Sequence, residues 1–164
     1  MRQWICLSLL ATLSLPALAG KAHLHGEGTL AARIDKDSLH LTLHLPMDVA
    51  VGFERAPRND KERTLLADAG KRLEDGTALF VPTPAAQCTL RSREIRLPSF
   101  SGQGKEAHAD IEANYRFHCA VPQVLKTLDT TLFKHFRRLY RLQAQGSNGQ
   151  GTMRLAPKLP QLRF

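Results

Sequence analysis

Leu39-His40-Leu41-Thr42-Leu43-His44-Leu45 is the most regular stretch of this sequence. Leucines alternate with polar side chains, and this period of two is typical of a β-strand with one buried and one solvent-exposed face. Asp35-Lys36-Asp37-Ser38, just before it, favours a turn, and Pro46 ends it. A second alternation of apolar and polar residues, from Ile111 to Cys119, predicts a similar strand later in the chain.

The segments around these strands predict helices and further strands. Apolar residues at helical spacing predict one helix over 61–74 and another over about 122–136. Shorter strands are expected over 29–34, 79–81 and 87–97, with a closing hairpin over 139–145 and 151–156. This order indicates an α+β fold of antiparallel sheets with two helices. It fits a single domain over 20–164 or two pseudo-symmetric strand-strand-helix-strand lobes, about 20–85 and 86–164.

Residues 1–19 have the features of a cleaved signal peptide. Arg2 precedes a long apolar run, and Ala17-Leu18-Ala19 supplies the small residues of a cleavage site. No later stretch approaches the roughly 18–20 apolar residues that a membrane span needs. We therefore expect an exported mature chain that begins at Gly20 and has no membrane span.

Cys88 and Cys119 remain after removal of the leader. An even pair of cysteines in an exported protein indicates a disulfide bond. A redox or metal-binding role is the alternative, although the chain has no Cys-x-x-Cys motif. Closing the loop between the two cysteines would remove about 3–4 kcal/mol of unfolded-state entropy.

The formal net charge is +8 at pH 7. Basic chains often bind nucleic acid, but an exported protein meets little of it, so we do not expect a nucleic-acid partner. The densest basic stretch contains Lys134, Arg137, Arg138 and Arg141. This stretch is either a solvated face or a surface that docks an acidic partner.

Histidines near the predicted mature N-terminus are candidate metal ligands. His23 and His25 alternate about one leucine, so in an extended segment their Cβ atoms lie on one side and roughly 6.6 Å apart. That spacing allows both imidazoles to bind one Zn²⁺ ion; two exposed polar residues are the alternative. His108, Asp110 and Glu112 form a second alternating row, which is either a weaker zinc site or a solvated strand face.

Motifs of catalysis are absent from the sequence. It contains no Gly-x-Ser-x-Gly, no His-Glu-x-x-His and no phosphate-binding glycine loop. Both mature cysteines are expected to be oxidised, which removes a thiol nucleophile. We therefore expect a protein that is not an enzyme.

Several segments together resemble the ZrgA family of periplasmic zinc-uptake proteins, over about residues 23–156. They are His23-Leu24-His25-Gly26, Val51-Gly52-Phe53-Glu54-Arg55-Ala56-Pro57, Ala86-Gln87-Cys88 and Tyr115-Arg116-Phe117-His118-Cys119. The resemblance implies a periplasmic protein that binds Zn²⁺ and is accessory to zinc acquisition or buffering. It also implies a zinc transporter component as a partner, and it leaves the oligomeric state open.

The resemblance assigns ligands residue by residue. His23 and His25 would bind Zn²⁺, and Glu54 would complete the shell or orient a histidine; His108 and Asp110 would form a weaker site on a loop. Family members commonly carry a histidine-rich tract between the two cysteines, and a histidine where this chain has Arg55. Both departures remove nitrogen ligands. The alternative function is therefore a periplasmic interaction module with a basic surface that has lost most zinc binding.

Overall fold

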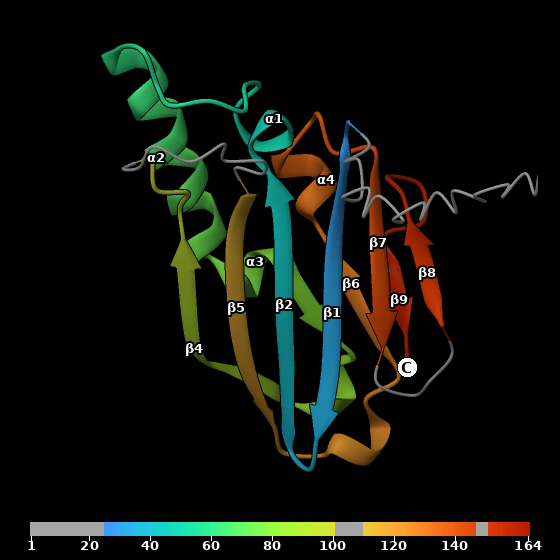
Figure 1. Ribbon diagram of the computed structural model, residues 1–164. Helices are drawn as coiled ribbons and strands as arrows, with labels where there is room; N and C mark the ends of the chain where they lie inside the picture. The colour runs from blue at the N-terminus through green and yellow to red at the C-terminus, as the bar shows by residue number, and fades with distance from the viewer. Residues whose placement is uncertain (1–24, 101–109, 147–150) are drawn as a thin grey trace, which may run out of the picture.

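The computed structural model describes residues 25–100, 110–146 and 151–164 of the protein. Two sheets organise this part of the chain (Figure 1). The larger has the strand order β4-β5-β2-β1-β7-β8, with β1 (Glu27–Asp35), β2 (Ser38–Pro46), β4 (Cys88–Arg96), β5 (Asp110–Cys119), β7 (Arg141–Gly146) and β8 (Thr152–Leu155). The smaller has the order β3-β6-β9, with β3 (Phe80–Pro82), β6 (Thr127–Thr130) and β9 (Gln161–Arg163).

Helices are few, and most of those in the described ranges are short. They are α1 (Met47–Ala50), α2 (Asp60–Glu74), α3 (Gly76–Leu79) and α4 (Leu132–His135), with 3-10 turns at Pro84–Ala86 and Pro122–Val124. None of them is both long and apolar enough to cross a membrane. All neighbouring strands are antiparallel except β1 and β7. The predicted α+β class is therefore confirmed.

Strand β2 lies in the middle of the larger sheet, between β1 and β5. Its four leucines, Leu39, Leu41, Leu43 and Leu45, are at most 1 % exposed, as the sequence alternation predicts. Full burial of each such side chain contributes about 1.5–3 kcal/mol. The smaller sheet and α3 lie behind the larger sheet (Figure 1), so the larger sheet has a covered apolar face and an open polar face.

The parallel pairing of β1 with β7 joins an early strand to a late one. Gly28 lies opposite Leu142 in this register, and the backbone N–H groups of Tyr140 and Arg141 both donate to the carbonyl of Gly26. Strands from both expected lobes, about 20–85 and 86–164, therefore lie side by side in one sheet. The pairing also brings residues before β7 next to the start of β1.

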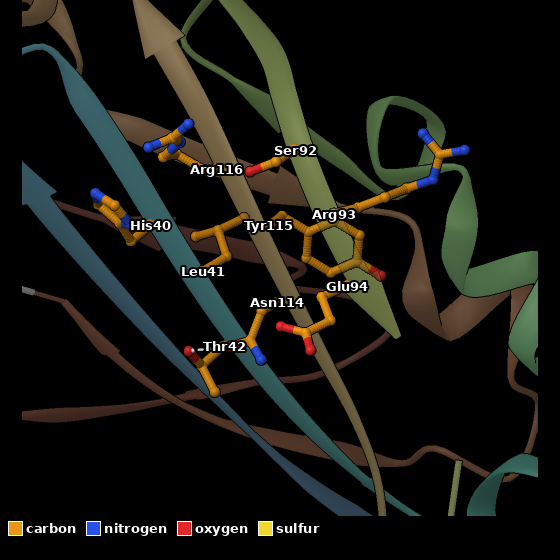
Figure 2. A pocket seen from close by; sticks show the side chains of 9 residues that line it. All are labelled: His40, Leu41, Thr42, Ser92, Arg93, Glu94, Asn114, Tyr115 and Arg116. Atoms are coloured by element: carbon orange, nitrogen blue, oxygen red, sulfur yellow. Dashed lines mark hydrogen bonds between the residues drawn. The ribbon is translucent and has the colours of Figure 1, made fainter. Parts of the chain in front are cut away.

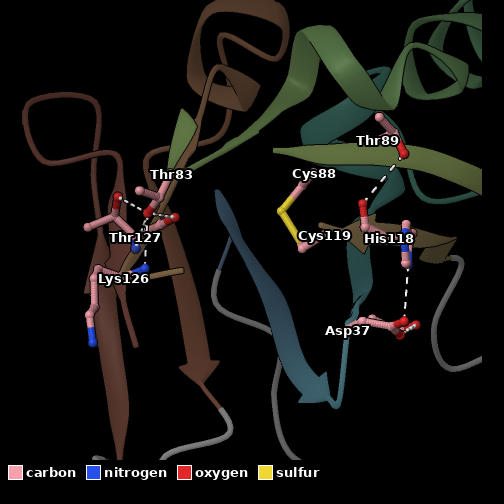
Figure 3. The surroundings of a disulfide bond; sticks show 9 residues. Asp37, Thr83, Cys88, Thr89, His118, Cys119, Lys126 and Thr127 are labelled. Carbon is pink, nitrogen blue, oxygen red and sulfur yellow. Dashed lines mark hydrogen bonds and ion pairs between the residues drawn. A yellow bond between two sulfur atoms is a disulfide. The ribbon is translucent and has the colours of Figure 1, made fainter. Parts of the chain in front are cut away.

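The prediction of a helix over about 122–136 is wrong. This segment forms a 3-10 turn, strand β6 and the single turn α4. The hydroxyl of Thr83 accepts hydrogen bonds from the backbone N–H groups of Lys126 and Thr127, and β6 pairs with β3 and β9 (Figure 3). Threonines at 127, 130 and 131 favour extended backbone, and pairing in the smaller sheet outweighs the helical spacing of the leucines.

Helix α2 follows the prediction over 61–74, and an ion pair joins its first turn to the preceding loop. The side chain of Asn59 caps the helix by accepting from the N–H of Glu62 at 2.9 Å. Both carboxylate oxygens of Glu62 accept from the guanidinium of Arg55, at 2.7 and 2.8 Å, and one also accepts from the N–H of Arg58. The Arg55 contact and the Arg58 N–H lower the pKa of Glu62 to about 2.

The expected disulfide is confirmed. Cys88 begins β4, Cys119 ends β5, and the two residues are opposite each other in the strand register (Figure 3). The bond therefore links the strand ends that lie away from the β4–β5 connection, where the two strands are already paired.

We expect the Cys88→Ala/Cys119→Ala variant to lose about 3–4 kcal/mol of unfolding free energy, because its unfolded chain gains the entropy of an open loop. Urea unfolding followed by circular dichroism measures this. Wild-type protein in reductant should lose a similar amount. Equal midpoints for oxidised and reduced wild type would contradict the prediction.

Glu62 should make stability depend on acid pH. A carboxylate whose pKa is lowered on folding stabilises the protein above its ordinary value of 4.5, and this contribution disappears as the pH falls toward 2. The thermal midpoint of wild type should therefore fall more steeply across this window than that of Glu62→Gln. Glu74→Gln, at the other end of α2, should keep the wild-type slope. Equal slopes for wild type and Glu62→Gln would refute the prediction.

Candidate metal centre

Three side chains from separate segments meet at one end of the larger sheet. His25, Asp48 and Glu54 each offer a donor atom, and these atoms lie within 4.8 Å of one another. No other such group of three is found among the residues that the structure describes. Donor atoms about 2.0–2.2 Å from a zinc ion lie roughly 3.4 Å apart, so modest side-chain rotations would close this cluster on an ion.

Strand pairing brings the three segments together. In the antiparallel pair of β1 and β2, Thr29 lies opposite His44, so the start of β1 and the end of β2 lie at the same end of the sheet. His25 precedes β1, and α1 follows directly after β2 at this end (Figure 1). The carbonyl of Met47 accepts from the N–H groups of Val51 and Gly52, and this turn directs the chain toward Glu54.

Burial of one face of α1 positions Asp48. Met47 and Val49 are at most 2 % exposed, so the aspartate between them points to the surface. Its Oδ2 is hydrogen-bonded to Nδ1 of His25 at 3.0 Å. This bond and the nearby carboxylates of Asp48 and Glu54 raise the pKa of His25.

The other oxygen of Asp48 makes this cluster suitable for a cation. Oδ1 is buried and has no hydrogen-bond partner among the described residues. An unpaired buried carboxylate oxygen is costly, and a bound cation would satisfy it. One imidazole and two carboxylates are a donor set that zinc accepts, and three protein ligands leave a fourth position open.

A shallow hollow of about 450 Å³ contains the cluster. Besides the three donors, Phe53, Arg138 and Tyr140 line it. His25 has a side chain that is 85 % exposed, whereas that of Asp48 is 20 % exposed. The candidate site is therefore open to solvent at His25, whereas Asp48 is largely covered by the protein.

The structure brings together two of the expected ligands, His25 and Glu54, and adds Asp48, which the sequence reasoning missed. His23 and His108 lie outside the described residues. Asp110 begins β5 opposite Pro46 and does not belong to the cluster. No local pattern marks Asp48, because its role depends on the strand pairing that places α1 beside His25.

Two arginines near the site have different surroundings. Arg55, where the sequence resemblance leads us to expect a histidine, binds Glu62 of α2, and its Cζ lies 5.0 Å from the centroid of the Phe53 ring. In the basic stretch, Arg141 pairs with Glu27, whereas Arg138 lines the hollow. The basic stretch is therefore not one uniform surface: Arg141 contacts the start of β1, and Arg138 lies at the candidate metal centre.

A second hollow, of about 650 Å³, lies on the open face of the larger sheet (Figure 2). There the hydroxyl of Thr42 donates to Asn114, and the Asn114 amide donates to Glu112. Arg116 lies opposite His40 on one side and Ser92 on the other. This face is a polar hydrogen-bonded surface without a trio of metal donors in the described part of the chain.

The fold and the cluster define an α+β protein with a candidate divalent-cation centre at one end of its main sheet. A family model described as ZrgA family zinc uptake protein matches residues 22–164. The chain belongs to this family, and membership supports a role in zinc acquisition. No curated protein matches the chain.

Proposed function

We propose that this protein binds Zn²⁺ at His25, Asp48 and Glu54 in the periplasm and is accessory to zinc acquisition or buffering. The observation that carries the proposal is the meeting of three donors, one with an unpaired buried oxygen, in a chain of a zinc-uptake family. His23, two residues before His25, remains a predicted additional ligand. The predicted leader and the Cys88–Cys119 disulfide support export.

The exposure of the site favours transfer of zinc over a structural role. The cluster is at the surface, and the leucine core of the larger sheet is complete without it. Ligands on a solvent-open surface allow an ion to enter and leave without unfolding. We therefore propose a protein that holds zinc reversibly and delivers it to a transporter component, without catalysis of its own.

Removal of a ligand should weaken zinc binding. We expect His25→Ala and Asp48→Asn each to lower the affinity for Zn²⁺ by at least the roughly 10- to 100-fold typical of losing an outer-shell partner, because the first removes a direct donor and the second replaces a charged donor by a neutral amide. Isothermal titration calorimetry of the full mature chain measures this, with circular dichroism to verify folding.

His135→Ala is the matched control, since it removes an exposed histidine of α4 that does not belong to the cluster. It should keep the wild-type affinity. Wild-type affinity in both His25→Ala and Asp48→Asn would overturn the assignment.

Docking of an acidic partner is the second candidate function, and unpaired arginines on the open sheet face favour it. Within the described ranges, neither Arg91 nor Arg116 forms an ion pair, although both line one hollow with Ser38 and His118. Arg116 also lies opposite His40 and Ser92 in the strand register, so no carboxylate stands directly across from it. An anionic partner would supply the complementary charge.

An acidic peptide tests this second function. We expect Arg91→Gln/Arg116→Gln to reduce the salt-sensitive binding of a fluorescent ten-glutamate peptide, measured by anisotropy with chelator present. Lys134→Gln/Arg137→Gln removes the same charge from another exposed segment and should bind like wild type. Equal losses in both variants would show only a net-charge effect and would reject this docking face.

A further inference from the structure

Arg138 lies beside the candidate metal centre without pairing with its carboxylates. It lines the same hollow as Asp48 and Glu54. Nevertheless, no ion pair or hydrogen bond joins its side chain to a carboxylate in residues 25–100, 110–146 and 151–164. The guanidinium therefore lines the same hollow as two carboxylates without being held by either of them.

The backbone is shaped to admit this guanidinium. A Cβ placed on Gly52 would lie 2.9 Å from Cζ of Arg138 and 3.0 Å from one of its terminal nitrogens. Gly52 also has φ +91, which other residues rarely adopt. The loop between α1 and Glu54 therefore holds Arg138 against its backbone by means of a residue without a side chain.

The charges of the hollow change sign when a divalent cation binds. Without a cation, the two carboxylates of Asp48 and Glu54 outweigh the one guanidinium of Arg138 in this hollow. A bound Zn²⁺ neutralises both carboxylates and leaves the charge of Arg138 in excess. The loaded hollow then attracts an anion, and the three donors of the described cluster leave a fourth coordination position for it, or a fifth if His23 also binds.

We propose that zinc binds here together with a small carboxylate, which ligates the ion with one oxygen and accepts hydrogen bonds from Arg138 with the other. This inference rests on the proposed zinc site and names a co-ligand for it. Hydrogen bonds from a guanidinium to a carboxylate oxygen are charge-assisted and among the stronger ones, and a hollow of about 450 Å³ accommodates such a molecule. By linkage, the carboxylate raises zinc affinity as much as zinc raises carboxylate affinity.

Zinc titration with acetate as the probe tests the co-ligand. At constant ionic strength, replacing perchlorate by acetate should raise the Zn²⁺ affinity of wild type about tenfold, and that of Arg138→Gln by less than about twofold. Arg137→Gln is the matched control, because it removes an adjacent exposed arginine that does not line the hollow. It should respond to acetate like wild type.

The visible spectrum of the Co²⁺-loaded protein gives an independent readout, since its bands report the donor set of the metal. Acetate should change this spectrum in wild type and Arg137→Gln at concentrations that leave Arg138→Gln unchanged. Zinc binding with the same acetate response in all three proteins, or with none, would overturn the co-ligand and leave the zinc site intact. Failure of wild type to bind zinc in either salt would overturn the zinc site and the co-ligand together.

Discussion

The antiparallel pairing of β2 with β1 and β5 is the constraint on which the rest of the structure depends. It buries a continuous row of leucines under the larger sheet. A shift of one residue in either register would turn these leucines to the open face. The same register sets which residues lie at each end of the strands. Strand pairing therefore determines both the apolar core and the position of the candidate metal centre.

The candidate metal centre lies at the end of the sheet where β1 begins and β2 ends. His25 and α1 are close together there because β1 and β2 are antiparallel. Buried neighbours hold Asp48, whereas His25 and Glu54 remain exposed. A partly fixed set of donors can select a cation and still release it. The parallel pairing of β7 with β1 brings Arg138, three residues before β7, to this hollow. Its guanidinium adds a positive charge beside the two carboxylates.

The departure at Arg55 has a structural consequence. In place of the histidine common in the family, this chain has an arginine that binds Glu62 and so ties the loop after α1 to the first turn of α2. A possible nitrogen ligand is replaced by an ion pair that orders the loop carrying Glu54. The candidate metal donors among the described residues are one imidazole and two carboxylates. Carboxylates are harder donors than imidazole, so two carboxylates with one imidazole make a harder donor set than a cluster of histidines.

Local sequence patterns were enough to predict the central strands, helix α2, the cysteine pair and two members of the cluster, because alternation, helical spacing and family motifs all lie within short segments. The sequence did not determine the smaller sheet: Leu125, Leu128 and Leu132 have helical spacing, but β6 exists because β3 and β9 supply backbone partners. Nor did it reveal Asp48 or Arg138, which lack a local signal. Only the tertiary structure decided these points, since strand pairing joins residues that are far apart in the chain, and no short-range pattern encodes such contacts.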